Sequence, residues 1–227
     1  MTKHGIQSVV SFLHLIILIG LLSACAADGD RMRQQLYDLQ ACNQADSLMT
    51  NDSLATALCT WFDSHGTPNE RMLAHYLMGR TWADKGEAPQ ALEEYHTAAE
   101  CADTTATDCD YRLLCRVYAQ MSSIFYQQNL MEYYLNSLDN SIWYASKVND
   151  IPVVLNSSAY KMVGYERMNL PDSVTTTYEK VYDLYCQEND TITGIRFFGL
   201  AFGSYVLTGQ LMKARYYMEQ YPRKLKM

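Results

Sequence analysis

The stretch that decides the fold of this chain begins with Gly79-Arg80-Thr81-Trp82 and continues through Gly86, Ala91, Tyr95 and Ala98. It places a small residue three positions before an aromatic one, then a turn glycine, and then two alanines and an aromatic residue at helical spacing. Gly79 and Ala91 would let two antiparallel helices approach closely, while Trp82 and Tyr95 fill the space beside them. The stretch therefore predicts a tightly packed helical hairpin.

The same pattern recurs in weaker form further along the chain. Ser122 repeats the small position 43 residues after Gly79, with Phe125 as its aromatic partner, and Gly164 follows Ser122 by 42 residues. The aromatic, turn and alanine positions recur near the end of the chain at Tyr205, Gly209 and Ala214. A period of about 41 residues predicts an array of similar hairpins.

Apolar residues past position 30 recur at intervals of three and four, which predicts helices rather than strands. Turn signals such as His65-Gly66-Thr67-Pro68 and Leu170-Pro171 separate them. Ten helices are expected, at 31–48, 53–64, 69–86, 88–102, 110–128, 130–148, 151–169, 172–188, 191–208 and 211–221. We predict an all-α fold of about five antiparallel hairpins, with an irregular helical bundle as the alternative to a repeat array.

These spacings resemble the tetratricopeptide repeat, although His75 stands where that family usually has tryptophan and Asp103 where it often has proline. The resemblance implies a right-handed α-solenoid. The segments Ala45-Asp46-Ser47-Leu48-Met49 and Asp52-Ser53-Leu54-Ala55 are also similar to the opening of tetratricopeptide-repeat lipoproteins of the Bacteroidetes type. Many such relatives continue into a transmembrane helix, a coiled coil and a DNA-binding domain, so a regulator role is not carried over to a chain that stops at Met227.

The first residues read as an export signal. The apolar run 9–22 has 14 residues, fewer than the roughly 20 that span a bilayer, and suits the core of a signal peptide. Leu22-Ser23-Ala24-Cys25 resembles the bacterial lipobox, which implies cleavage after residue 24 and acylation of Cys25. A plain signal with a chance cysteine is the alternative. We predict a signal peptide at 1–24, a tether at 25–30 and a helical domain at 31–227.

Composition and motifs exclude several classes of function. The formal net charge of −7 disfavours nucleic acid as a partner. No Cys-x-x-Cys pair, glycine-rich phosphate loop, Gly-x-Ser-x-Gly or His-Glu-x-x-His is present, so we expect no enzyme, no cofactor and no metal. His75 and His96 are interpreted as packing residues. Cys101 and Cys109 flank a polar loop and would be able to close it as a disulfide, whereas small core positions suit Cys42, Cys59, Cys115 and Cys186.

The first helix of each hairpin in such an array lines a concave groove. On the predicted registers, basic and tyrosine side chains point into it beside Leu73, Ala119 and Ser123; the candidates for partner binding are Tyr76, Arg80, Arg116, Tyr126, Lys161, Tyr165 and Arg196. Basic side chains in the groove of an acidic chain favour an anionic or carboxylate-bearing ligand; the alternative is that they only balance acids on neighbouring helices.

The last expected helix carries an apolar stripe formed by Leu211, Ala214, Met218 and Tyr221. Because a solenoid needs a polar outer face at its end, this stripe either packs inward or docks on a second copy of the chain.

These observations favour a membrane-anchored, non-enzymatic scaffold or adaptor that binds a protein or peptide in the bacterial cell envelope. The absence of aspartate at residue 26 favours the outer membrane over the inner one and leaves the leaflet open. The alternative is a periplasmic sensor module, related to tetratricopeptide-containing regulators, that binds a peptide or a small anionic ligand. A glycan-uptake lipoprotein ranks third.

Overall fold

The computed structural model describes residues 28–188 and 191–224, with side chains for 28–187 and 197–219. The predicted signal peptide, Cys25 and the side chain of Arg196 lie outside the described residues. Every regular element in the described ranges is a helix. Residues 28–44 form the first of them, and the others are α2 (Asp52–His65), α3 (Pro68–Asp84), α4 (Ala88–Cys101), α5 (Tyr111–Gln127), α6 (Met131–Lys147), α7 (Ile151–Arg167), α8 (Pro171–Glu188), α9 (Thr191–Leu207) and α10 (Leu211–Lys224).

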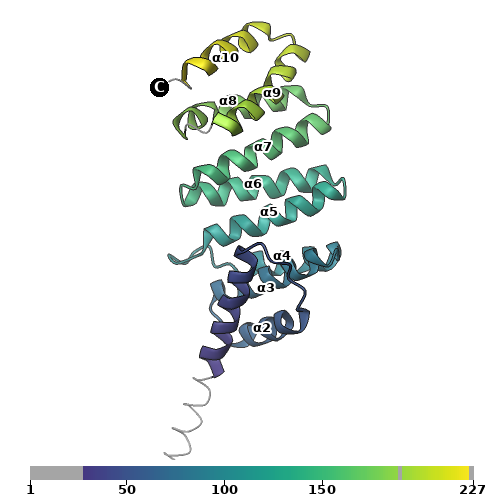
Figure 1. Cartoon of the computed structure of the whole chain (residues 1–227), viewed down its shortest axis with the longest axis vertical. Helices are drawn as coiled ribbons and strands as arrows, with labels where there is room; N and C mark the ends of the chain where they lie inside the picture. The colour runs from purple at the N-terminus through teal and green to yellow at the C-terminus, as the bar shows by residue number, and fades with distance from the viewer. Residues whose placement is uncertain (1–27, 189–190, 225–227) are drawn as a thin grey trace, which may run out of the picture.

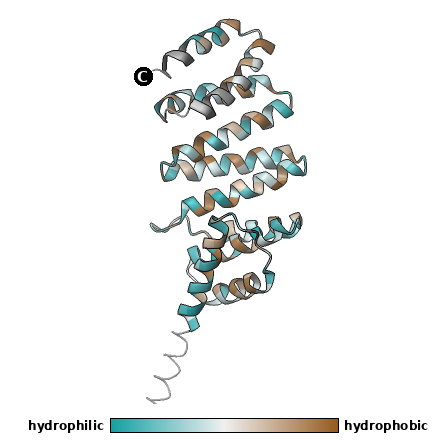
Figure 2. Cartoon of the chain, in the orientation of Figure 1, coloured by the Kyte–Doolittle hydropathy of each residue, from teal (hydrophilic) through white to brown (hydrophobic). Residues whose placement is uncertain are grey.

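The helices form successive antiparallel hairpins that stack along one long axis (Figure 1). The odd-numbered helices also contact one another, α3 with α5, α5 with α7 and α7 with α9, so they form one layer of the stack. Hydrophobic and hydrophilic residues are interleaved along the stacked helices (Figure 2), as expected when each helix packs on one side only. No helix in the described part of the chain is long and apolar enough to cross a bilayer.

A left-handed residue ends the first helix of each hairpin and defines the true repeat. At these five turns, positive φ angles occur at Asp46 (57°), Gly86 (81°), Asn129 (60°), Asn169 (56°) and Gly209 (71°), which are 40 to 43 residues apart; Asn149 (52°), after the second helix of its hairpin, lies outside this series. At the last four turns, the backbone N–H of the residue after the left-handed one donates to the carbonyl oxygen of an aromatic residue five positions earlier, at 2.8 or 2.9 Å. These aromatic residues are Trp82, Phe125, Tyr165 and Tyr205. This capping geometry satisfies the carbonyls that a helix end leaves open.

The turn positions show that, contrary to the prediction, Gly164 does not occupy the same position of the repeat as Gly79 and Ser122. Gly79 and Ser122 each lie seven residues before a left-handed residue, but Gly164 lies five before Asn169, so Met162 is their counterpart. Gly164 therefore faces a different neighbour, the side chain of Tyr134 on α6. The prediction recognised a small residue but assigned it to the wrong position of the repeat.

The first helix is described from residue 28, so residues 28–30 of the predicted tether are helical, and it ends at 44 rather than 48. It lies against α3: Leu36 is fully buried, Arg33 Nε donates to Glu70 Oε1 at 2.7 Å, and Arg80 Nε donates to Asn43 Oδ1 at 3.1 Å. As a result, residues 72–79 of α3 are buried without interruption. The layer of odd-numbered helices is thus covered at α3, whereas side chains of α5 and α7 line a hollow.

Candidate functional site

A hollow of about 510 Å³ lies between α5 and α7, with α6 contributing to its wall. On α5, the lining residues recur at intervals of three and four, which puts them on one face of the helix. The side chains around the hollow are Arg112, Cys115, Arg116, Ala119, Ser122, Ser123 and Tyr126 from α5, Tyr134 and Leu138 from α6, and Asp150, Val153, Asn156, Ser157, Tyr160 and Val163 at and after the start of α7.

Hydrogen bonds between α6 and α7 hold this wall in place. The hydroxyl of Tyr134 donates to the carbonyl oxygen of Tyr160 at 2.6 Å, and the hydroxyls of Ser141 and Ser157 lie 3.2 Å apart. Both bonds cross from one hairpin to the next, so they fix the spacing of the repeats that frame the hollow. The site is therefore built on rigid elements rather than on loops.

The hollow carries uncompensated positive charge. Arg112 and Arg116 are exposed, and among the residues that the structure describes no carboxylate lies within ion-pair distance of either guanidinium. Arg167 stacks over the ring of Tyr126, with its guanidinium carbon 4.9 Å from the ring centre. The single acid in the lining, Asp150, accepts a hydrogen bond from the backbone N–H of Val153 and so caps α7. Burial raises the pKa of Cys115 to about 12, which keeps that thiol neutral.

Of the predicted groove residues, Arg116 and Tyr126 meet in this hollow, together with Ala119 and Ser123. Lys161 and Tyr165 line a second hollow of about 470 Å³ formed by α6, α7 and α8, because the register predicted for α7 was wrong. There Lys161 pairs with Asp139 and lies over the ring of Tyr165. Sequence reasoning missed Arg112, although it lies one helical turn before Arg116.

The predicted groove positions on α3 are not accessible. Tyr76 is 4% exposed and packs beside Tyr95, because the 28–44 helix covers this face of α3. Arg80 donates hydrogen bonds to Asn43, Gln120 and Asp84, which links three parts of the chain. The prediction that Tyr76 lines the groove is therefore wrong, and Arg80 is occupied within the fold.

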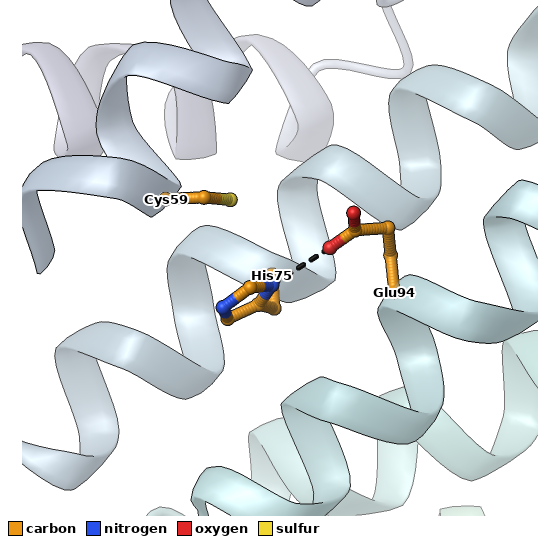
Figure 3. A group of neighbouring side chains, drawn as sticks. All are labelled: Cys59, His75 and Glu94. Carbon is orange, nitrogen blue, oxygen red and sulfur yellow. Dashed lines mark hydrogen bonds and ion pairs between the residues drawn. The ribbon is translucent and has the colours of Figure 1, made fainter. Parts of the chain in front are cut away.

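A second group of reactive side chains lies where α2, α3 and α4 meet (Figure 3). His75 Nδ1 is 2.7 Å from Glu94 Oε2, His75 Nε2 is 3.0 Å from Asp63 Oδ1, and Cys59 is buried beside them. Burial opposes the charge on His75, but hydrogen bonds with Cys59, Glu94 and Asp63 raise its pKa well above the usual range. Burial raises the pKa of Cys59. His75 thus forms hydrogen bonds with two acidic side chains in addition to packing, whereas Nε2 of the exposed His96 lies 3.2 Å from Glu100 Oε1 on the same helix.

The predicted disulfide is absent, since Cys101 and Cys109 are both free thiols. Hydrogen bonds hold the intervening loop instead. The side-chain amide of Asn69 donates to the carbonyl of Asp108 at 2.7 Å, and its oxygen accepts from the N–H of Asp110 at 3.0 Å. One side chain of α3 therefore supplies the closure that the prediction assigned to the two cysteines.

The C-terminal end of the stack exposes apolar side chains. Of the predicted stripe, Ala214 is buried, Leu211 and Met218 are exposed, and the side chain of Tyr221 lies outside the described residues. Leu207 (76%) and Met212 (80%) add to the exposed surface. Self-association through this end stays a prediction.

No protein-family profile and no curated protein matches the chain. Among solved structures, it is similar to a putative kinesin light chain from Podosopora anserina with nearly identical TPR-like repeats, at 12% identity and a TM-score of 0.61 over 86% of this chain and 94% of that one. A single-residue variant of the same protein matches at 12% identity and a TM-score of 0.60, with the same coverage. The predicted fold is therefore confirmed as a right-handed α-solenoid of the tetratricopeptide type.

Proposed function

We propose that this chain is a non-enzymatic, lipid-anchored interaction module of the bacterial cell envelope, and that it holds a carboxylate-bearing peptide or protein segment in the hollow between α5 and α7. The observation that carries the proposal is the pair Arg112 and Arg116. Two exposed guanidinium groups, which have no acidic partner in the described part of the chain, line a hollow in a chain of net charge −7. Arginine binds carboxylates in a bidentate manner and is favoured for this task.

The tyrosines of the hollow support the same reading. Tyr126 and Tyr160 come from the two facing helices, and both combine a flat apolar ring with a polar hydroxyl. Such side chains provide contact area at low conformational cost and are common in protein interfaces. An extended segment with an acidic residue would place its carboxylate near the arginines and its apolar groups on these rings.

The double variant Arg112→Glu/Arg116→Glu tests this proposal. The full chain, solubilised in a mild detergent, serves as bait for proteins from its own cells, and captured partners are quantified by mass spectrometry. We expect the double variant to lose a partner that the wild type retains stoichiometrically. Lys147→Glu/Lys180→Glu makes the same change in net charge outside the hollow and should retain it. Equal capture by both double variants, at unchanged helicity, would contradict the proposal.

The lipid anchor has its own test because it rests on the sequence alone, on the apolar run 9–22 and on Leu22-Ser23-Ala24-Cys25. We expect the mature protein to begin at Cys25, to carry the mass of acyl chains there and to remain with membranes. Cys25→Ser should abolish both the added mass and the membrane association, since an acyl chain contributes about 0.8 kcal/mol per buried methylene. An unacylated wild-type protein would rule out the anchor while leaving the groove proposal standing.

The size of the hollow favours one further candidate, a sensor of small anionic ligands. A volume of about 510 Å³ lies within the range of sites that enclose small molecules. In that case, a dicarboxylate or a short acidic peptide should raise the melting temperature of the isolated protein. The shift should vanish in Arg112→Glu/Arg116→Glu, and no macromolecular partner should be needed.

A further inference from the structure

We propose that Cys59, His75 and Glu94 form a binding site for one divalent transition-metal ion, with Zn²⁺ as the best-fitting ion. Each residue comes from a different helix of the N-terminal hairpins: Cys59 from α2, His75 from α3 and Glu94 from α4. The site lies outside the α5–α7 hollow and shares no residue with its lining. The proposal is therefore independent of the proposed function.

The donor atoms are already close enough to share an ion. One ligand atom from each residue lies within 4.8 Å of the other two. Tetrahedral zinc with bonds of about 2.0 to 2.3 Å needs ligand atoms about 3.3 to 3.8 Å apart, so rotations of the side chains can complete the geometry. Figure 3 shows the sulfur of Cys59 and the carboxylate of Glu94 near the imidazole ring of His75, each coming from a different helix.

The environment of His75 matches that of a metal ligand. Its two nitrogens face different carboxylates, Nδ1 toward Glu94 and Nε2 toward Asp63. When Nδ1 binds an ion shared with Glu94, the Nε2–H group still donates to Asp63. Histidine ligands commonly donate their other ring N–H to a carboxylate, which fixes the orientation of the ring. Asp63 is therefore the positioning residue for this site.

The set of donors favours zinc over the common hard cations. A thiolate and an imidazole are ligands for Zn²⁺, whereas Ca²⁺ and Mg²⁺ prefer oxygen atoms alone. The ion would replace the thiol proton of Cys59 and the proton on His75 Nδ1, and both protons leave to solvent. Three protein ligands leave a fourth position for water. Since Cys59 and His75 are each only 8% exposed, the protein holds these two donors in place before any ion arrives.

The test uses the full chain in detergent, stripped of metal with a chelator and then titrated with Zn²⁺ against a fluorescent zinc indicator and, separately, with Co²⁺. We expect one equivalent of each ion to bind. Bound Co²⁺ should show the thiolate charge-transfer band and the visible bands of four-coordinate cobalt. Cys59→Ser should abolish the charge-transfer band and weaken zinc binding by at least 100-fold, and His75→Gln and Glu94→Gln should also weaken it strongly. Asp63→Asn should weaken it by about 10- to 100-fold, as for other groups that orient a histidine ligand.

The matched controls are Cys42→Ser and His96→Gln, which change the same residue types at exposed positions. Both should bind zinc as the wild type does. The absence of a tightly bound equivalent in the wild type would overturn the proposal, as would a cobalt–thiolate band that survives Cys59→Ser, because the ion would then be bound elsewhere. Should His75→Gln fail to fold, the wild-type spectrum and Cys59→Ser still decide the question.

Discussion

The aromatic ring of Tyr134 on α6 occupies the space that the missing side chain of Gly164 leaves on α7. A Cβ atom at position 164 would lie 2.7 Å from Tyr134 Cε1 and 3.0 Å from Leu135 Cδ2. The ring has little freedom to move, because its hydroxyl is bonded to the carbonyl of Tyr160 at 2.6 Å. This contact sets the distance between two successive hairpins and forms one end of the wall of the α5–α7 hollow.

Gly164→Ala should therefore destabilise the fold, by about 1 kcal/mol, because overpacking a tight contact typically costs more than alanine gains in helix propensity. The measurement is thermal or urea unfolding followed by circular dichroism. Gly203→Ala on α9 is the matched control, since a Cβ there meets no atom within 4 Å. It should stabilise the chain by about 0.5 to 1 kcal/mol. Equal effects at the two sites would show that the contact with Tyr134 is not tight.

Gly86 tests a different physical cause, the left-handed backbone of the hairpin turn. A Cβ at this position meets no atom within 4 Å, but φ is +81°. Gly86→Ala should thus cost about 1 kcal/mol from backbone strain alone. Gly86→Asn should cost less, because Asn129 and Asn169 adopt the same conformation at the equivalent turns. Unfolding midpoints of the two variants check the order, and an alanine variant as stable as the asparagine one would contradict it.

Glu70 should make stability depend on pH. Burial alone would raise the pKa of Glu70, but hydrogen bonds from Thr67 and Arg33 outweigh that effect and lower the pKa. A lowered pKa means that the ionised carboxylate stabilises the folded chain above the pKa of an unfolded glutamate, about 4.3. This contribution is lost as the pH falls through the lower pKa of the folded state.

Glu70→Gln should consequently lower the free energy of unfolding by about 1 kcal/mol at pH 7, a value limited by the partial exposure of Arg33. The difference from the wild type should shrink as the pH falls below about 4. Glu93→Gln, at an exposed position of α4, should change stability by less than about 0.5 kcal/mol across the range. Melting curves at several pH values provide the comparison. A difference that persists unchanged at pH 3 would refute the assigned cause.

The sequence predicted the helices well because their signals are local. The spacing from Gly79 to Ala98 describes one hairpin completely, and the structure places Gly79 against the ring of Tyr95 as that spacing requires. The register of α7 failed for a physical reason. Tyr134 stands at the repeat position that the small residue Ala91 occupies in the earlier repeat. Gly164 is small because it must leave room for the ring of Tyr134, a residue of another hairpin.

The candidate sites were harder to predict because they depend on contacts between distant segments. Arg116 and Tyr126 were found from the face of one helix, yet Tyr76 was misplaced because nothing in its own helix reveals the cover formed by residues 28–44. Cys59, His75 and Glu94 are 16 and 19 residues apart, which matches no metal-binding motif. Only the stacking of three helices brings them together.

The cover over α3 provides the last prediction. Leu36 is fully buried in the core cluster that also contains Tyr76 and Leu77. Leu36→Ala should lower the free energy of unfolding by about 2 to 5 kcal/mol, as for other leucines removed from a core. It should also speed amide hydrogen exchange in α3 more than in α7, because the lost packing contacts are in the N-terminal part of the stack. Leu48→Ala, which changes a leucine that is 78% exposed, should have an effect within about 0.5 kcal/mol. Uniformly faster exchange along the whole chain in Leu36→Ala would instead mean that the hairpins unfold as one unit and that the 28–44 helix is not a local cover.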